Sequence, residues 1–424
     1  MKCEFIIENI GQLVTCASPG GPKRRSAMQD VGVIEGGAVA IGEGKLLGVG
    51  RAQDIAAGFT AAETIDAVGR VVVPGFVDPH THIVFAGDRL DEFELKIKGA
   101  NYLDILASGG GIISTVKKTR DASKAELVAQ ATERLDKMLE CGTTTCEIKT
   151  GYGLNTETEL KMLDVIRQLG ESHVMDVVPT FLAAHAVPPE YRANPEAYVV
   201  LICEEMLPLA YNCLFGAQDG QPRVTAFADV FCENNAFDLE QSRRVLEAAK
   251  RLGFALKAHV DEFTNLGGSR MAIGLGAASI DHLDAISDEE IELLSRSDTV
   301  GIVTPTVNFN FGSREFANVR KLIDAGCAIA LSTDYNPGSA PCPSQPMAMA
   351  IACRYQKLLP SEALNAVTIN AAHSIGLGAT NGSLEAGKLA DLVIADVKDY
   401  RSLAYEFGSV QIESVMKRGN WVEV

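Results

Sequence analysis

The feature that most constrains the fold is a repeated alternation in the middle of the chain, where short apolar runs are each followed by a helical pattern. Lys124–Cys141 and Leu239–Leu252, for example, carry apolar residues at three- and four-residue spacing, as amphipathic helices do. Alternating strands and helices form parallel sheets. Eight repeats therefore predict an α/β fold with a closed, TIM-like (β/α)8 barrel. The eight strand-like runs are Val72–Val77, Thr143–Lys149, Met175–Ala184, Ala228–Cys232, Phe254–His259, Ala278–Leu283, Thr299–Pro305 and Cys327–Thr333.

The two ends of the chain have a different pattern. Residues 1–72 contain short apolar segments, such as Gly37–Ile41 and Lys45–Val49, which are separated by turn residues and show no helical period. The end of the chain contains similar segments, such as Leu389–Ala395. We therefore expect a small β-sandwich domain built from residues 1–72 and 377–424, attached to a barrel formed by residues 73–376.

Charge and cysteine content exclude several classes of protein. The chain has 38 Lys and Arg against 55 Asp and Glu, which gives a net charge of −17. Phosphate backbones and anionic membranes would repel it, so we expect neither nucleic acid nor a membrane as partner. The ten cysteines form no C-x-x-C pair, which is typical of a reduced, cytoplasmic protein. The sequence also shows no signal-peptide core and no apolar run long enough for a transmembrane helix.

Histidines gather where a barrel of this kind has its active site, at the carboxyl ends of the strands. Five of the seven histidines fall at predicted strand ends, namely His80, His82, His185, His259 and His282. His80 and His82 are two residues apart, so their rings point to the same side and form half of a metal site. His259 and Asp334 would complete a shell of three nitrogens and one oxygen, which suits zinc and also iron or manganese.

A cation in that shell would lower the pKa of a bound water to about 7, and the resulting nucleophile needs a base. His282, on the next strand, is the best candidate, and Asp334 could share the role. Glu262 lies three residues after His259, where it could exchange a proton with a substrate nitrogen. Lys149 ends the second strand and not the fourth, where dinuclear barrels carry a bridging lysine. We therefore expect a mononuclear site, with Lys149 structural or beside the substrate.

The sequence resembles the amidohydrolase superfamily along essentially its whole length, and within it the imidazolonepropionase family of histidine degradation. Pro74–His82 matches the opening motif of the superfamily. The segments that are specific to the narrower family are Phe85–Arg89, Gly109–Val116, Lys149–Leu154, Ala184–Tyr191 and Ser332–Ser339, with Gly387–Ile394 matching the returning C-terminal strand.

The resemblance implies hydrolysis of the cyclic amide of 4-imidazolone-5-propanoate to N-formimidoyl-L-glutamate, with one zinc or iron per chain, in a homodimer. Arg89 would bind the propionate carboxylate, which its planar guanidinium group suits. The other implied substrate contacts are Tyr152, His185, Glu262, Asn336, Gly338 and Ser339. The implied metal ligands are His80, His82, His259 and Asp334, and the implied catalytic residues are His282, Glu262 and Asp334.

The chain departs from the family pattern at the seventh strand, where Leu-Leu-Pro-Gly is expected. It reads Ile302–Thr306 there, followed by Asn308 and Asn310. This change would reshape one wall of the pocket and so affect which ring fits. A smaller departure is Val260, where the family has alanine beside the metal ligand His259; this residue is not itself a ligand.

Two alternatives use the same sequence features. A metal-dependent deaminase of a purine- or pyrimidine-like heterocycle would have a similar shell and a glutamate three residues after the third histidine, but it would release ammonia. A non-catalytic scaffold could keep the barrel for assembly alone. Such scaffolds usually lose metal ligands, whereas this chain has all four and the candidate base.

Overall fold

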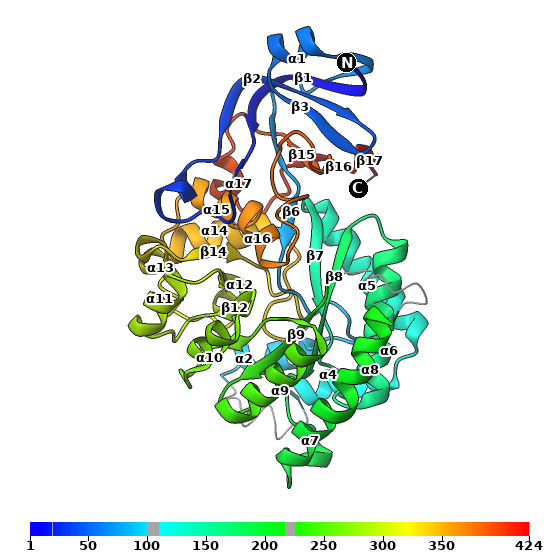
Figure 1. The fold of residues 1–424 in the computed structure, drawn as a ribbon, viewed down its shortest axis with the longest axis vertical. Coiled ribbons are helices and arrows are strands. Elements are labelled where there is room, and N and C mark those ends of the chain that lie inside the picture. The colour runs from blue at the N-terminus through cyan, green and yellow to red at the C-terminus, as the bar shows by residue number, and fades with distance from the viewer. Residues whose placement is uncertain (19, 100–109, 217–224, 424) are drawn as a thin grey trace.

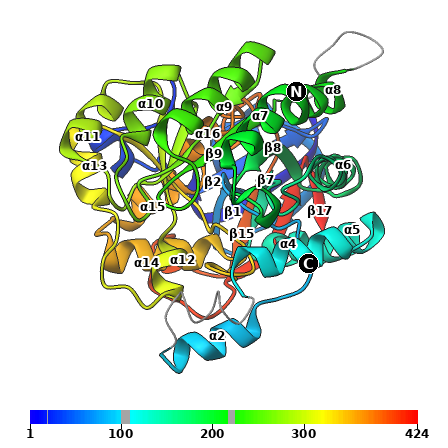
Figure 2. The same cartoon turned by 90° about the horizontal axis from the view of Figure 1, so that it is seen from below.

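The computed structural model describes residues 1–18, 20–99, 110–216 and 225–423. The middle of the chain forms a barrel of parallel strands, and the two ends of the chain form a separate sheet at one end of it (Figure 1). Seen from below, the helices surround the strands (Figure 2). Gly109, the first residue of one of the motifs named above, lies outside the described residues.

Eight parallel strands form the barrel wall, which confirms the predicted fold class. The wall closes through a parallel bridge between Thr81, just after the first strand, and Tyr335, just after the last. In neighbouring order the strands are β6 (Phe76–Asp78), β7 (Thr143–Lys149), β8 (Asp176–Ala184), β9 (Phe227–Cys232), β11 (His259–Val260), β12 (Ser279–His282), β13 (Val300–Val303) and β14 (Ala328–Leu331).

Two predicted strands are each divided in the structure. The run Val72–Val77 splits at Gly75 into β5 (Val71–Pro74), which joins the sheet of the chain ends, and β6, which joins the barrel. Gly75 permits this close crossing, because a Cβ atom there would lie 2.3 Å from Oγ1 of Thr144. The run Phe254–His259 splits into β10 (Ala255–Leu256) and β11, which both pair with β9.

Helices connect the barrel strands, and their starts follow from local sequence. Helix α5 (Lys124–Glu140) begins with a reciprocal capping box between Ser123 and Glu126. Asp238 and Gln241 cap α9 (Leu239–Leu252) in the same way. Both helices confirm the sequence prediction. The other α-helices in the described part of the chain are α1 (Ala52–Gly58), α2 (Leu90–Ile97), α4 (Ile112–Asp121), α6 (Thr156–Ser172), α7 (Pro195–Leu201), α8 (Leu207–Phe215), α10 (Gly268–Leu275), α11 (Asp288–Ser295), α12 (Pro305–Asn310), α13 (Val319–Ala325), α14 (Gln345–Tyr355), α15 (Pro360–Ala366), α16 (Ile369–Ser374) and α17 (Ser402–Tyr405).

Strands from both ends of the chain join in one hydrogen-bonded sheet of eight strands, as the end segments predicted (Figure 1). Apolar side chains from the two ends share one core, including Leu13, Val39, Leu392 and Met416. The neighbouring order is β17 (Asn420–Val422), β16 (Ile412–Lys417), β15 (Leu392–Ala395), β5, β1 (Lys2–Val14), β2 (Val33–Gly42) and β3 (Lys45–Arg51), with β4 (Thr60–Asp66) also beside β1.

One helical stretch in the described part of the chain is long and apolar enough to cross a membrane by length and composition alone. It spans residues 195–215 and consists of α7, a π-helical turn (η3, Ile202–Met206) and α8. Several of its side chains are buried, and the hydroxyl of Tyr198 donates to the carbonyl of Ala183 at the end of β8. The stretch is therefore packed onto the barrel as one of its outer helices.

Candidate active site

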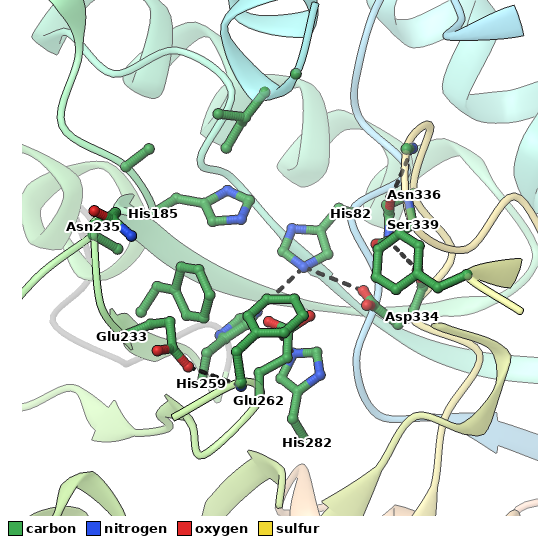
Figure 3. Close-up of a pocket in the computed structure, with 18 of the residues that line it drawn as sticks. His82, His185, Glu233, Asn235, His259, Glu262, His282, Asp334, Asn336 and Ser339 are labelled. Atoms are coloured by element: carbon green, nitrogen blue, oxygen red, sulfur yellow. Dashed lines mark hydrogen bonds and ion pairs between the residues drawn. The ribbon is translucent and has the colours of Figure 1, made fainter. Parts of the chain in front are cut away.

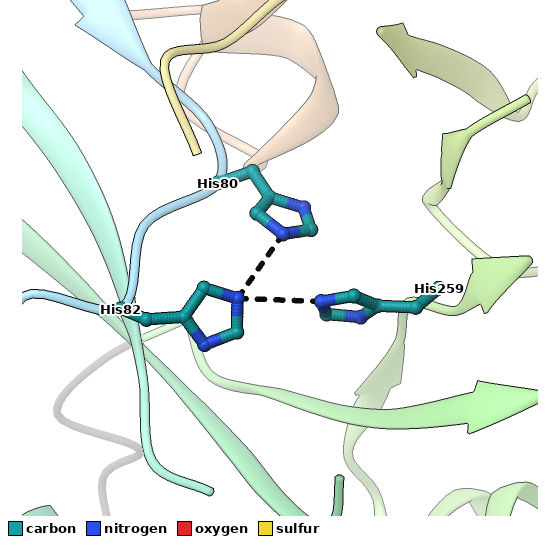
Figure 4. Close-up of side chains that lie close together, drawn as sticks. All are labelled: His80, His82 and His259. Atoms are coloured by element: carbon teal, nitrogen blue, oxygen red, sulfur yellow. Dashed lines mark hydrogen bonds between the residues drawn. The ribbon is translucent and has the colours of Figure 1, made fainter. Parts of the chain in front are cut away.

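Three histidines bring their Nε2 atoms together at the carboxyl ends of the barrel strands (Figure 4). His80 and His82 follow β6, and His259 begins β11. Nε2 of His82 lies 3.3 Å from Nε2 of His80 and also 3.3 Å from Nε2 of His259. Oδ1 of Asp334, after β14, lies 3.5 Å from Nε2 of both His80 and His82. The four predicted metal-site residues therefore lie together.

This arrangement fits one divalent cation. Ligand atoms placed tetrahedrally at about 2.0–2.1 Å from zinc are about 3.3–3.4 Å apart, close to the observed separations. Burial holds the pKa values of His80 and His82 well below the usual range, so both rings are neutral, as metal ligands must be. Oδ1 of Asp334 is buried and has no hydrogen-bond partner among the described residues. Burial also raises the pKa of Asp334, and a cation bound beside it would favour its ionised form.

Carboxylates lie behind two of the histidines, next to their Nδ1 atoms. Oδ2 of Asp281, in β12, lies 2.6 Å from Nδ1 of His80, and Oδ2 of Asp229, in β9, lies 3.0 Å from Nδ1 of His259. At His80 the carboxylate accepts the Nδ1–H and leaves the lone pair on Nε2, the atom that faces the other candidate ligands. Asp229 lies against Nδ1 of His259 without hydrogen-bond geometry, and its Oδ1 accepts the backbone N–H of His259 at 3.2 Å. These two aspartates were not predicted from the sequence. An acidic residue inside an otherwise apolar strand was the signal that could have identified them.

Lys149 lies behind the ligands and not in the cavity. Its ammonium group is fully buried, 2.7 Å from Oε1 of Glu147 and 2.8 Å from Oδ2 of Asp229. Burial alone would lower the pKa of Lys149, but the surrounding carboxylates outweigh it and raise the pKa above its usual value. Of the two predicted positions for Lys149, the structure therefore gives the structural one.

His282 and Glu262 lie together on the cavity side of the ligands (Figure 3). Nε2 of His282 is 3.8 Å from Oε2 of Glu262, and Nδ1 is 3.0 Å from the hydroxyl of Thr304. Burial lowers the pKa of His282 and raises that of Glu262, which favours the neutral form of each group. Thr304 belongs to the segment that departs from the family pattern, and its contact with His282 was not predicted.

Two residues of this centre have left-handed backbone conformations. The φ angle is 49° at Asp334 and 85° at His282. Such conformations cost roughly 1–2 kcal/mol per residue in L-amino acids other than glycine. Backbone strain of this kind clusters at functional sites, where the surrounding structure maintains it.

A cavity of about 660 Å³ opens next to these groups. It is lined by all the predicted substrate contacts, namely Arg89, Tyr152, His185, Glu262, Asn336, Gly338 and Ser339. The ring of His185 stacks on that of His82, with centroids 5.0 Å apart (Figure 3). Its Nδ1 lies 3.1 Å from the carbonyl oxygen of Gly151, and burial lowers its pKa to about 3. His185 is therefore a neutral ring on the cavity wall.

The loop after β14 is shaped by Asn336. Its Oδ1 accepts from the backbone N–H groups of Gly338 and Ser339, both at 2.8 Å. Its Nδ2 donates to the carbonyl of Asp334 and to the hydroxyl of Ser339, both at 2.7 Å. Because the amide makes all four bonds within the loop, Asn336 fixes the loop that carries the metal-site residue Asp334.

The guanidinium group of Arg89 lies next to this loop, at Gly338. Its Nε donates to Oγ1 of Thr115 at 2.9 Å, and Nη1 lies 3.9 Å from Oε2 of Glu92. Among the described residues its terminal nitrogens make no hydrogen bond, so they can bind a ligand. Gly338 allows the approach, because a Cβ atom there would lie 2.3 Å from Nη1 of Arg89. Lys96, seven residues after Arg89, also lines the cavity and was not predicted. Its seven-residue spacing from Arg89 on one helix was an available signal.

Comparison with known proteins identifies relatives along the whole chain. Residues 71–422 match the amidohydrolase family. The imidazolonepropionase of Chloroflexus aggregans is 50% identical over 420 residues, which cover 99% of this chain and 98% of that protein. The imidazolonepropionase of Herpetosiphon aurantiacus is 49% identical over 417 residues, which cover 98% and 96% of the two chains.

Solved structures share the fold at much lower sequence identity. An adenosine deaminase from Xanthomonas campestris with bound zinc superposes with a TM-score of 0.74 at 20% identity, covering 99% of this chain and 93% of that one. The guanine deaminase of E. coli superposes with a TM-score of 0.67 at 16% identity and covers 99% of both chains. At this level of identity the likeness concerns the fold alone.

Proposed function

The chain belongs to the amidohydrolase family and, within it, to the imidazolonepropionases, and on this basis we propose how its residues open the ring of 4-imidazolone-5-propanoate. The reaction is hydrolysis to N-formimidoyl-L-glutamate in histidine degradation. The observation that carries the proposal is that one cavity combines the His80–His82–His259–Asp334 centre with the guanidinium group of Arg89. The four-residue centre suits hydrolysis of the cyclic amide, and the guanidinium group of Arg89 suits binding of the propionate carboxylate.

Substrate binding follows from the charges and surfaces around the cavity. Arg89 binds the propionate through its terminal nitrogens, since a planar guanidinium group matches a carboxylate. The neutral rings of Tyr152 and His185 line the cavity and suit a flat heterocycle. The loop of Gly338 and Ser339 contacts the chain of the substrate beside Arg89. These contacts fix the ring with its carbonyl carbon toward the four-residue centre.

Proton transfer falls to His282 and Glu262. A divalent cation bound by the centre would lower the pKa of a bound water to about 7 and so supply the nucleophile at neutral pH. His282 takes the proton of the attacking water on Nε2, while Thr304 holds its Nδ1. The bond between the carbonyl carbon and the ring nitrogen then breaks. Glu262, whose pKa burial raises, gives its proton to the departing nitrogen and regains one from His282.

Cofactor, assembly and location complete the proposal. We propose one cation per chain, zinc or iron, because three imidazoles and one carboxylate suit both metals. We further propose a homodimer, to be tested by light scattering. All ten cysteines are free thiols, which supports a reducing compartment such as the cytoplasm.

The test follows the ultraviolet absorbance of freshly generated 4-imidazolone-5-propanoate, with ammonia assayed in the same tube. We expect enzyme-dependent loss of the imidazolone, formation of N-formimidoyl-L-glutamate and no ammonia. His80→Ala should abolish the activity, because it removes one ligand. Decay at only the spontaneous rate would overturn the proposal, and ammonia release would indicate the deaminase alternative.

A further inference from the structure

Helix α2 turns one charged face toward the cavity. Arg89 precedes its first residue, and Glu92 and Lys96 follow three and seven residues later. This spacing places them on one face of the helix, and all three line the cavity. The opposite pattern is usual, with the apolar face of a helix turned inward. On α2 the solvent-exposed side chains include the apolar Leu90, Phe93 and Ile97.

The ammonium group of Lys96 is held at the cavity without a carboxylate. It lies 5.1 Å from the ring centroid of Phe311 and 3.5 Å from the carbonyl oxygen of Gly338. No Asp or Glu oxygen among the described residues forms an ion pair with it. Lys98, two residues later, behaves as an ordinary surface lysine, since its side chain is 64% exposed and pairs with Glu94.

The two cations of this face converge on one residue of the β14 loop. Gly338 leaves room for Nη1 of Arg89, which would lie 2.3 Å from a Cβ atom there, and its carbonyl faces Lys96. Glu92 cannot neutralise both. Its Oε2 is 3.9 Å from Nη1 of Arg89, and its Oε1 accepts the backbone N–H of Gly111. Among the residues that the structure describes, one of the two positive charges therefore has no carboxylate partner here, in a chain whose net charge is −17.

We propose that Lys96 is a second carboxylate-binding residue, which acts with Arg89 on the propionate end of the substrate. The assignment rests on the proposed function, which supplies an anionic substrate. Arginine offers a planar fork, and lysine adds a compact charge that can approach the same carboxylate from another direction. Burial lowers the pKa of Lys96, Glu92 raises it, and the positive charge of Arg89 lowers it. A carboxylate bound between the two cations would relieve the repulsion between Lys96 and Arg89.

The first test compares turnover of 4-imidazolone-5-propanoate by the wild-type holoenzyme with that of Lys96→Met, Lys96→Arg and the control Lys98→Met. We expect Lys96→Met to raise KM about tenfold while kcat changes less than threefold, since a lost charged contact is worth about one decade of affinity. Lys96→Arg should restore most of the loss, and Lys98→Met should match the wild type. An unchanged KM in Lys96→Met would overturn the proposal.

The second test is independent of turnover. Calorimetry at pH 8 measures the Kd of two unreactive probes, imidazole-4-propanoate and 4-ethylimidazole, which differ in the carboxylate. Lys96→Met should raise the Kd of imidazole-4-propanoate about tenfold and leave the Kd of 4-ethylimidazole unchanged. If the substitution raises both Kd values equally, or changes neither, the role of Lys96 is overturned. A wild type that binds imidazole-4-propanoate in a Lys96-dependent way but does not open the imidazolone would refute the proposed function alone.

Discussion

Nδ1 of His80 lies 2.6 Å from Oδ2 of Asp281, and both side chains are fully buried. The contact fixes the ring so that its Nε2 faces His82 and Asp334. Oδ2 of Asp281 also lies 3.6 Å from the ammonium nitrogen of Lys257, so the carboxylate is part of a buried charge network. Asp281 is thus a positioning residue for the metal site.

Asp281→Asn should lower metal affinity by about 10- to 100-fold, the usual effect of losing such a partner. Titration of the metal-free protein with zinc against a competing chelator measures this directly. Asp288→Asn, on the exposed start of α11, is the matched control and should bind as the wild type does. Wild-type affinity in Asp281→Asn would show that His80 does not need this carboxylate.

Thr304 gives a second prediction, because its hydroxyl lies 3.0 Å from Nδ1 of His282. Thr304 precedes the first residue of α12, but its side chain makes no capping bond with the helix. Thr304→Val keeps the shape and removes the hydroxyl, so His282 should lose its fixed orientation. We expect kcat to fall about tenfold with little change in KM, since charged-ring hydrogen bonds are worth about 1.5 kcal/mol or more. Thr304→Ser should retain most of kcat; equal kcat in all three proteins would contradict the role.

The sequence predicted which residues gather into the His/Asp cluster because an H-x-H pair after an apolar run, and further polar residues at strand ends, are local signals. It could not predict Asp281 as the partner of His80, because that contact joins residues 201 positions apart. The contact depends on how the barrel closes, which periodicity does not specify. The division of Val72–Val77 at Gly75 was missed for a similar reason. An apolar run indicates a buried strand and does not say which of two sheets it joins.

Gly338 supplies a third prediction. An alanine Cβ at this position would lie 2.3 Å from Nη1 of Arg89, so the guanidinium group would have to move. Gly338→Ala should therefore raise KM for the anionic substrate, by about tenfold, and change kcat less. Gly274→Ala is the control, since its Cβ meets no atom within 4 Å and its backbone needs no positive φ. An unchanged KM would mean that Arg89 can bind the carboxylate from a shifted position.

Asp284, in the loop after β12, should make stability depend on pH. Burial raises the pKa of this carboxyl to about 7, whereas an unfolded Asp titrates near 3.9. Between these values the folded protein keeps a proton that the unfolded chain has lost. Stability therefore falls as pH rises from about 4 to 7 and is constant above, because the folded state binds more protons in that window.

Asp284→Asn removes this titration and keeps the local hydrogen bonds. Both contacts, from Nδ2 of Asn308 at 3.0 Å and from the backbone N–H of Ala317 at 2.9 Å, go to Oδ1, which the amide retains. The variant should therefore be more stable than the wild type at pH 8, and its advantage should shrink steadily as the pH falls toward 4. Urea denaturation of the metal-loaded proteins across this pH range measures the stability advantage and its pH dependence. The control is Asp288→Asn, at an exposed position. If the stability difference between the variant and the wild type does not change between pH 4 and 8, Asp284 is ionised in the folded protein across this range. The two hydrogen-bond donors would then be enough to compensate its burial.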